Sequence, residues 1–370
     1  MDDNKNKEDE EEKKKKIEAA KKELKDQGYE IIKNIGQGKY GLIVDAKKDN
    51  NIYAVKIIIS DKNNNIQKEG MIKEFRGKNL VRIIQEIIKP SKFAIYIMEK
   101  SFIGNLTKSL SKYSNDTLLF KEPFLENFGD NLIRFFAKQI FSAIKTLNQG
   151  NLVHFDIKPD NILIFKGLEL KFIDFSFLKK CDTCKGNVPG GTFNFFSPEN
   201  FQDKKQFFED AILKKQDIFA AGITLYFLKY SHNPIIGQCK DNDSLKNYSI
   251  TMDCLQRAKL NISSYIYQDK DFTEFLTNLI DPNPEKRLDL ENILRNKWLN
   301  KNTKSIKKIT NINFFDEDCL FVELQKSDFL IRKRNYYQKN SDKKFKNENN
   351  NKNYKQIRKG KFKFGKRNNI

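Results

Sequence analysis

The sequence predicts an α+β fold with two lobes, a small mainly β N-lobe and a larger mainly α C-lobe. Apolar runs of strand length fill residues 29–100, for example Phe93 to Met98. Beyond Leu106 the apolar residues recur every three or four positions, as they do from Leu132 to Leu147. The first pattern is typical of strands and the second of buried helices. Strands first and helices after indicate an α+β domain.

The individual elements follow from the same patterns. Apolar residues before and after a glycine-rich turn at residues 36–41 predict two strands joined by a tight turn. Further strands are expected at Asn51–Ile59 and Phe93–Met98. In the C-lobe, residues 101–299, a long buried helix is expected at Leu132–Leu147, and two more at Ile218–Leu228 and Phe272–Ile280.

Charge separates both ends of the chain from this domain. Residues 1–28 are mostly charged and predict a head that is either disordered or a solvated helix. Residues 300–330 keep scattered hydrophobic side chains and are expected to dock as an extension. Residues 331–370 hold fifteen Lys or Arg against two acids, giving +13 of the +20 net charge, and predict a basic disordered tail.

The basic character therefore belongs mostly to the tail and does not predict a nucleic-acid-binding domain. The tail itself could contact nucleic acid, contact an anionic membrane, direct nuclear import, or simply solubilise the chain. The sequence has neither a bilayer-length apolar run nor a signal peptide, so we expect an intracellular protein, cytoplasmic or nuclear. The five cysteines predict no disulfide framework, and Cys181 with Cys184 is interpreted as an incidental exposed pair.

The run from Val153 to Asn161 holds the groups that phosphoryl transfer needs. It places an acid, a lysine and a carboxamide close together, namely Asp156, Lys158 and Asn161. These can supply a proton acceptor for a hydroxyl, a cation for the moving phosphoryl group and an oxygen ligand for magnesium. Each residue alone could instead be an ordinary loop residue or a helix cap.

A glycine-rich turn and a strand lysine complete this chemistry. Gly36, Gly38 and Gly41 let the backbone approach phosphate oxygens, to which exposed amides can donate. The alternative is an ordinary glycine hairpin. Lys56 lies on an otherwise apolar strand, where it is expected to face a cleft and pair with a phosphate or a carboxylate. The alternative is a surface lysine on an edge strand.

Taken in order, these motifs resemble the eukaryotic protein kinase superfamily, serine/threonine type, with its two-lobed fold. Three further matches are Asp174-Phe175-Ser176, Ser197-Pro198-Glu199 and Arg287, which in this family pairs with the glutamate. The resemblance implies a serine/threonine protein kinase that uses ATP and Mg²⁺ to phosphorylate a hydroxyl of a protein substrate. The alternative is a pseudokinase, which keeps the fold as a binding or scaffold module.

The resemblance also implies a role for each site residue. The catalytic group consists of Asp156 as base, Lys158, Asn161 and Thr192. The nucleotide-binding group consists of Gly36, Gly38, Gly41, Ile43, Ala54, Lys56, Glu69, Met98 and Glu99. Magnesium is expected on Asn161 and Asp174.

Three departures from the family pattern bear on activity. Phe155 replaces an arginine that usually pairs with an activation-segment phosphate, so the chain resembles the non-RD variant. Ser176 replaces a glycine, which should make a flip through positive φ harder. Glu69, the expected partner of Lys56 on a helix, lies one residue early by count, and one residue turns a helical side chain by about 100°.

Overall fold

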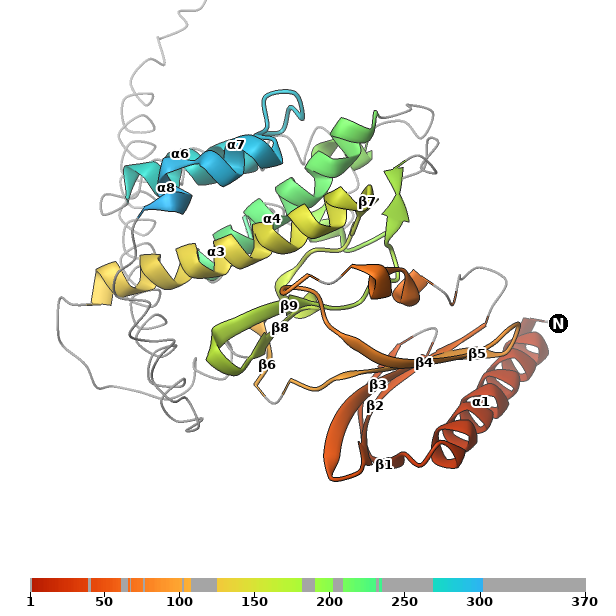
Figure 1. Cartoon of the computed structure of the whole chain (residues 1–370). Helices are drawn as coiled ribbons and strands as arrows, with labels where there is room; N and C mark the ends of the chain where they lie inside the picture. Colours follow the sequence, from red (N-terminus) through yellow and green to blue (C-terminus); the bar gives the residue numbers. More distant parts are fainter. Residues whose placement is uncertain are drawn as a thin grey trace, which may run out of the picture.

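The computed structural model describes residues 2–38, 41–60, 66, 68–75, 77–101, 103–107, 125–181, 190–201, 209–230, 233–234 and 269–301. The basic tail, nearly all of the 300–330 extension, Thr183 and Cys184 lie outside these residues. A five-stranded sheet forms the small lobe, and helices form most of the large one (Figure 1). The predicted two-lobed α+β fold is confirmed.

The N-lobe sheet has the strand order β1-β2-β3-β5-β4, with every neighbouring pair antiparallel. The strands are β1 (Glu30–Gly38), β2 (Gly41–Lys48), β3 (Asn51–Ile59), β4 (Ile83–Lys89) and β5 (Phe93–Glu99). The strand β4, which the sequence analysis did not predict, forms one edge of the sheet. A short 3-10 helix, η1 (Lys68–Glu74), lies between β3 and β4 along the chain.

Alternation along the strands divides the sheet into an inner and an outer face. Lys56 pairs in register with Ile43 of β2 and Tyr96 of β5, and successive residues on a strand point to opposite faces. Tyr96 joins the core that continues into the C-lobe, so these residues define the inner face. Val55 and Ile57 point to the outer face and are fully buried there.

The outer face is buried because α1 (Asp2–Asp26) packs on it, away from the C-lobe (Figure 1). The sequence left two states open for residues 1–28, a disordered head or a solvated helix. A helix is found, and it is not solvated on all sides, because Ile17, Ala20 and Leu24 are buried against the sheet. The spacing of three and four residues places these side chains on one stripe, which suffices to hold an otherwise charged helix.

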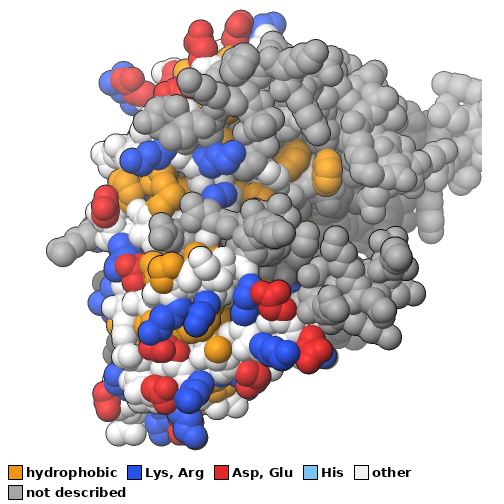
Figure 2. Space-filling view, turned by 90° about the vertical axis from the view of Figure 1, so that its right-hand side faces the viewer, with side chains coloured by type: hydrophobic (Ala, Val, Ile, Leu, Met, Phe, Trp, Pro, Cys, Tyr) orange, Lys and Arg blue, Asp and Glu red, His pale blue; other side chains and the backbone are white. Residues whose placement is uncertain are grey.

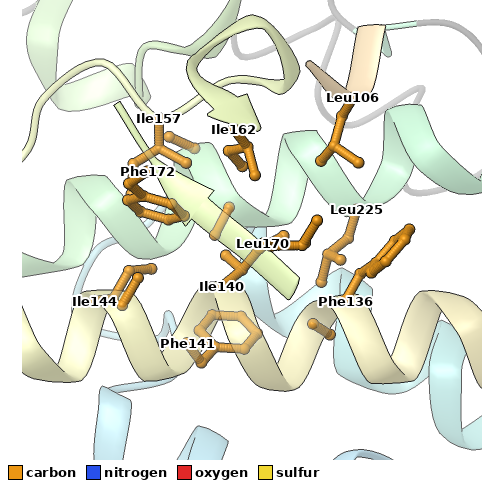
Figure 3. Close-up of a cluster of buried hydrophobic side chains, with 14 of the residues drawn as sticks. Leu106, Phe136, Ile140, Phe141, Ile144, Ile157, Ile162, Leu170, Phe172 and Leu225 are labelled. Atoms are coloured by element: carbon orange, nitrogen blue, oxygen red, sulfur yellow. The ribbon is translucent and has the colours of Figure 1, made fainter. Parts of the chain in front are cut away.

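The C-lobe is built around α3 (Leu125–Gln149), which spans the expected Leu132–Leu147 helix. Its apolar stripe packs against the sheet strand β9 (Glu169–Phe172) and against α4 (Asp210–Tyr230). Figure 3 shows side chains from these elements meeting in one cluster. The remaining helices are α6 (Lys270–Leu279), α7 (Leu290–Arg295) and α8 (Lys297–Asn300).

Two small sheets fix the loops that matter for function. The strands β8 (Ile162–Phe165) and β9 form a hairpin that also pairs with β6 (Gly104–Asn105). The strand β7 (Leu152–Val153) pairs with β10 (Lys179–Lys180). The segment between β7 and β8 is therefore held at both ends. It contains three of the four predicted catalytic residues, Asp156, Lys158 and Asn161.

The described surface carries both signs of charge. On the face shown in Figure 2, Lys and Arg side chains are interspersed with Asp and Glu. Among the described helices, none combines the length and the apolar character needed to cross a membrane.

Candidate active site

Lys56 reaches two carboxylates from the inner face of the sheet. Its Nζ forms an ion pair with Glu69 and lies 2.8 Å from Asp174 Oδ1. Burial alone would lower the pKa of this ammonium group, but Glu69 and Asp174 outweigh burial and raise the pKa above its usual value. The lysine is therefore held as a cation between the N-lobe and the segment that follows β9. The alternative of an edge-strand surface lysine does not apply, since β3 is an inner strand of the sheet.

Glu69 reaches Lys56 although its position in the sequence is one residue early. It lies on η1, which is a 3-10 helix and not an α-helix. A 3-10 helix has three residues per turn instead of 3.6, so a register counted for an α-helix does not apply. The second oxygen of Glu69 accepts a hydrogen bond from the backbone N of Phe175 at 3.2 Å. The carboxylate is buried and connects β3 to the Asp174-Phe175-Ser176 segment.

Asp156 lies at the centre of a second cluster, between β7 and β8. Its Oδ1 accepts from Thr192 Oγ1 at 2.7 Å, and its Oδ2 accepts from Asn161 Nδ2 at 2.7 Å. Lys158 Nζ lies 2.9 Å from Oδ2 and also donates to Thr192 Oγ1. The structure therefore brings together all four residues that the resemblance assigned to catalysis.

Asp217 of α4 holds the backbone of this loop through two hydrogen bonds. Its two carboxylate oxygens accept from the backbone N of His154 at 2.7 Å and of Phe155 at 3.0 Å. Burial raises the pKa of Asp217 to about 7, although the two donated hydrogen bonds favour its charged form. The sequence analysis predicted a helix at Ile218–Leu228 and gave Asp217 no role. Its role in holding the loop follows from the structure.

Asn161 and Asp174 are brought side by side by a backbone contact. The backbone N of Ile173, which precedes Asp174, donates to Asn161 O at 3.0 Å. The side-chain nitrogen of Asn161 donates to Asp156, which leaves its amide oxygen available as a ligand. An amide oxygen and a carboxylate suit a hard cation such as Mg²⁺. No group of three or more His, Cys, Asp or Glu among the described residues forms a separate metal cage.

The residues assigned to the nucleotide come from four strands. Apart from Lys56 of β3 and Glu69 of η1, described above, they are Gly36 and Gly38 of β1, Gly41 and Ile43 of β2, Ala54 of β3, and Met98 and Glu99 of β5. Only glycine fits at position 41, because a Cβ atom there would lie 1.9 Å from the carbonyl oxygen of Ile57. The Glu99 carboxylate accepts from Lys171 Nζ at 2.9 Å and from the backbone N of Arg82 at 2.7 Å. Its side chain thus links β5 to β9 of the C-lobe.

Phe155 is buried in a small apolar cluster that includes side chains from the start of the activation segment, residues 174–199, of which 182–189 lie outside the described residues. The cluster also contains Val153, Cys181 and Leu213, with Phe177 packed against it. Phe155 adopts a positive φ of 64°, and its side chain packs in this cluster. The expectation of an exposed cysteine pair does not hold for Cys181, whose side chain is only 3% exposed.

Glu199 and Arg287 form a bidentate ion pair. The two guanidinium nitrogens lie 2.7 Å and 2.9 Å from the two carboxylate oxygens, and both side chains are buried. The end of the activation segment is thereby attached to the loop before α7. This contact is the one that the resemblance implied for these two residues.

Comparison with known proteins finds a family match and relatives over most of the chain. Residues 29–299 match the family described as the protein kinase domain. The chain is 26% identical over 284 residues to the serine/threonine-protein kinase SAPK2 of Oryza sativa subsp. indica, covering 74% of this chain and 77% of that protein. It is 25% identical to the serine/threonine-protein kinase SRK2A of Physcomitrium patens, covering 74% of each chain. It is 24% identical over 282 residues to the Aurora kinase of Schizosaccharomyces pombe, covering 74% and 72%.

Proposed function

The chain belongs to the protein kinase family as an ATP-dependent serine/threonine kinase, and we propose that Asp156 is its catalytic base. The observation that supports this most directly is the cluster around Asp156. Thr192, Asn161 and Lys158 hold both carboxylate oxygens in place. A fixed carboxylate beside a lysine is the arrangement that can orient a substrate hydroxyl and accept its proton.

The other residues divide the remaining tasks between them. Lys158 supplies positive charge next to the base, where charge on the transferred phosphoryl group has to be compensated. Lys56, fixed by Glu69, presents a cation from the inner face of the sheet to the phosphates of ATP. Asn161 and Asp174 would hold Mg²⁺, which when bound would neutralise negative charge on the phosphates of ATP.

The described start of the activation segment packs against an apolar side chain at position 155. In place of an arginine, Phe155 contributes an apolar side chain that is 7% exposed, in a cluster with Cys181 and Leu213. Burial of an aromatic side chain stabilises such a cluster by about 1.5–3 kcal/mol, and it depends on no phosphate. We therefore infer that the kinase does not rely on an activation-loop phosphate read by this residue.

The alternative is a pseudokinase. Three departures from the family pattern favoured it, namely Phe155, Ser176 and the position of Glu69, and the last no longer does. Glu69 does reach Lys56, so the apparent misregister does not disable the pair. Phe155 and Ser176 remain as departures from the family, but neither takes away a group that reacts. The enzyme is therefore the better supported function.

Phosphate transfer from γ-labelled ATP to a generic basic protein tests the proposal. Asp156→Asn should lower the rate by about 10²–10⁴-fold while the protein melts like the parent. The matched control is Asp210→Asn, which changes an exposed carboxylate at the start of α4 and should keep the parent rate. Turnover by Asp156→Asn within about tenfold of the parent would remove Asp156 as the base.

A further inference from the structure

Ser176 introduces a hydroxyl group into the charged cluster around Lys56. Its Oγ donates to Asp174 Oδ1, lies 3.3 Å from Lys56 Nζ and lies 3.4 Å from Glu69 Oε1. A serine hydroxyl has one proton to donate and two lone pairs that accept. With the proton given to Asp174, the hydroxyl accepts from Lys56, so the third N–H of this ammonium group has a partner beside its two carboxylates.

The backbone of Ser176 is held in the same place from the N-lobe. Lys68 of η1 donates from Nζ to the carbonyl oxygen of Ser176 at 3.0 Å. The positive φ of this segment falls on Asp174, at 63°, and not on Ser176. Serine is thus unstrained in this conformation, and the expected cost of a flip through positive φ stays a prediction. The position tolerates a side chain, and the side chain is turned toward the reacting groups.

The two carboxylate oxygens of Asp174 differ in their contacts. Oδ1 binds both Lys56 and Ser176. Among the described residues no hydrogen bond reaches Oδ2. A carboxylate with one oxygen fixed by two donors cannot rotate freely, so its other oxygen keeps one direction.

We propose that Ser176 is a positioning residue that fixes Oδ1 of Asp174 and thereby presents Oδ2 to the divalent cation of the bound nucleotide. The proposal rests on the proposed function, in which Asp174 is a metal ligand. A glycine at this position would leave Lys56 as the only side chain that holds Oδ1. The serine adds a second, neutral donor that keeps the orientation without adding charge.

The test measures cation binding directly. Mn²⁺ is titrated into the protein with a non-hydrolysable ATP analogue, and free Mn²⁺ is followed by electron paramagnetic resonance. Ser176→Ala should weaken Mn²⁺ binding about ten- to hundredfold, the effect of losing one hydrogen bond to a charged group. Ser176→Thr keeps the hydroxyl and should bind within about twofold of the parent. Affinity for the analogue without Mn²⁺ should be the same for all three proteins.

The Asp174→Asn variant distinguishes the metal-ligand role of Asp174 from the positioning role of Ser176. If it binds Mn²⁺ as the parent does, Asp174 is not a metal ligand and the site assignment falls, together with this proposal. If Asp174→Asn weakens binding but Ser176→Ala matches the parent, only the positioning role is overturned. Equal weakening in Ser176→Ala and Ser176→Thr would also overturn it, because the hydroxyl would then not be the group that matters.

Discussion

Replacing Arg287 with alanine should destabilise the C-lobe strongly. The side chain is fully buried, and it donates to both oxygens of Glu199, to Lys215 O at 2.9 Å and to Asp281 O at 3.0 Å. It also lies over the ring of Phe219. Arg287→Ala strands a buried carboxylate, which costs roughly 3–5 kcal/mol. For a domain of this size each kcal/mol lowers Tm by about 2–4 °C, so we expect a fall of about 6–20 °C.

The assay is thermal unfolding of the parent and three variants. Arg295→Ala is the matched control, because Arg295 pairs with Glu291 on the surface of α7 and its side chain is 75% exposed. A surface pair contributes about 0–1 kcal/mol, so this variant should melt close to the parent. Glu199→Gln combined with Arg287→Met removes both charges and should recover part of the loss. If Arg287→Ala melts like Arg295→Ala, the buried pair contributes nothing and the reasoning is refuted.

Four further predictions concern activity and stability. Lys56→Met should lower phosphoryl transfer by orders of magnitude with an unchanged fold, as labelled-ATP assays and melting curves would show. Leu24→Ala should cost about 2–5 kcal/mol in a denaturant titration, because this α1 side chain is fully buried, and parent-like unfolding would mean that α1 is not docked. Phosphatase treatment and Thr183→Ala should each leave most of the activity, whereas a tenfold or greater loss restored by rephosphorylation would contradict the role given to Phe155. Burial lowers the pKa of His154 to about 4 from its usual 6.5, so the unfolded chain binds a proton that the folded chain does not. Stability should therefore fall as pH drops from 6.5 towards 4, and a His154→Asn variant that keeps the same slope would contradict this cause.

The catalytic loop was predictable from the sequence because its chemistry is local. Asp156, Lys158 and Asn161 lie within six consecutive residues, so their closeness needs no knowledge of the rest of the fold. Thr192 and Asp174 could be assigned only through the resemblance, since tertiary structure alone brings them near. The structure now gives their contacts.

Other features could not be predicted because they depend on a partner surface or on helix type. The charged head carries only Ile17, Ala20 and Leu24 as an apolar stripe, which is short unless a bare sheet face is known to lie opposite. The position of Glu69 was misleading because the count assumed an α-helix where a 3-10 helix forms. The contacts of the Ser176 hydroxyl depend on Lys56, which is more than a hundred residues away in the sequence.

The packing of α1 also bears on the order in which the chain can fold during synthesis. Every member of the cluster beneath α1 lies between Ile17 and Ile97. Its contacts are therefore all available once the first hundred or so residues have left the ribosome, before any C-lobe helix exists. The inner face of the same sheet depends on the C-lobe for its burial, because Tyr96 and Met98 share a core with residues as distant in the sequence as Trp298. The N-lobe can thus close its outer layer early, and it must wait for the end of the domain to cover the face that carries Lys56.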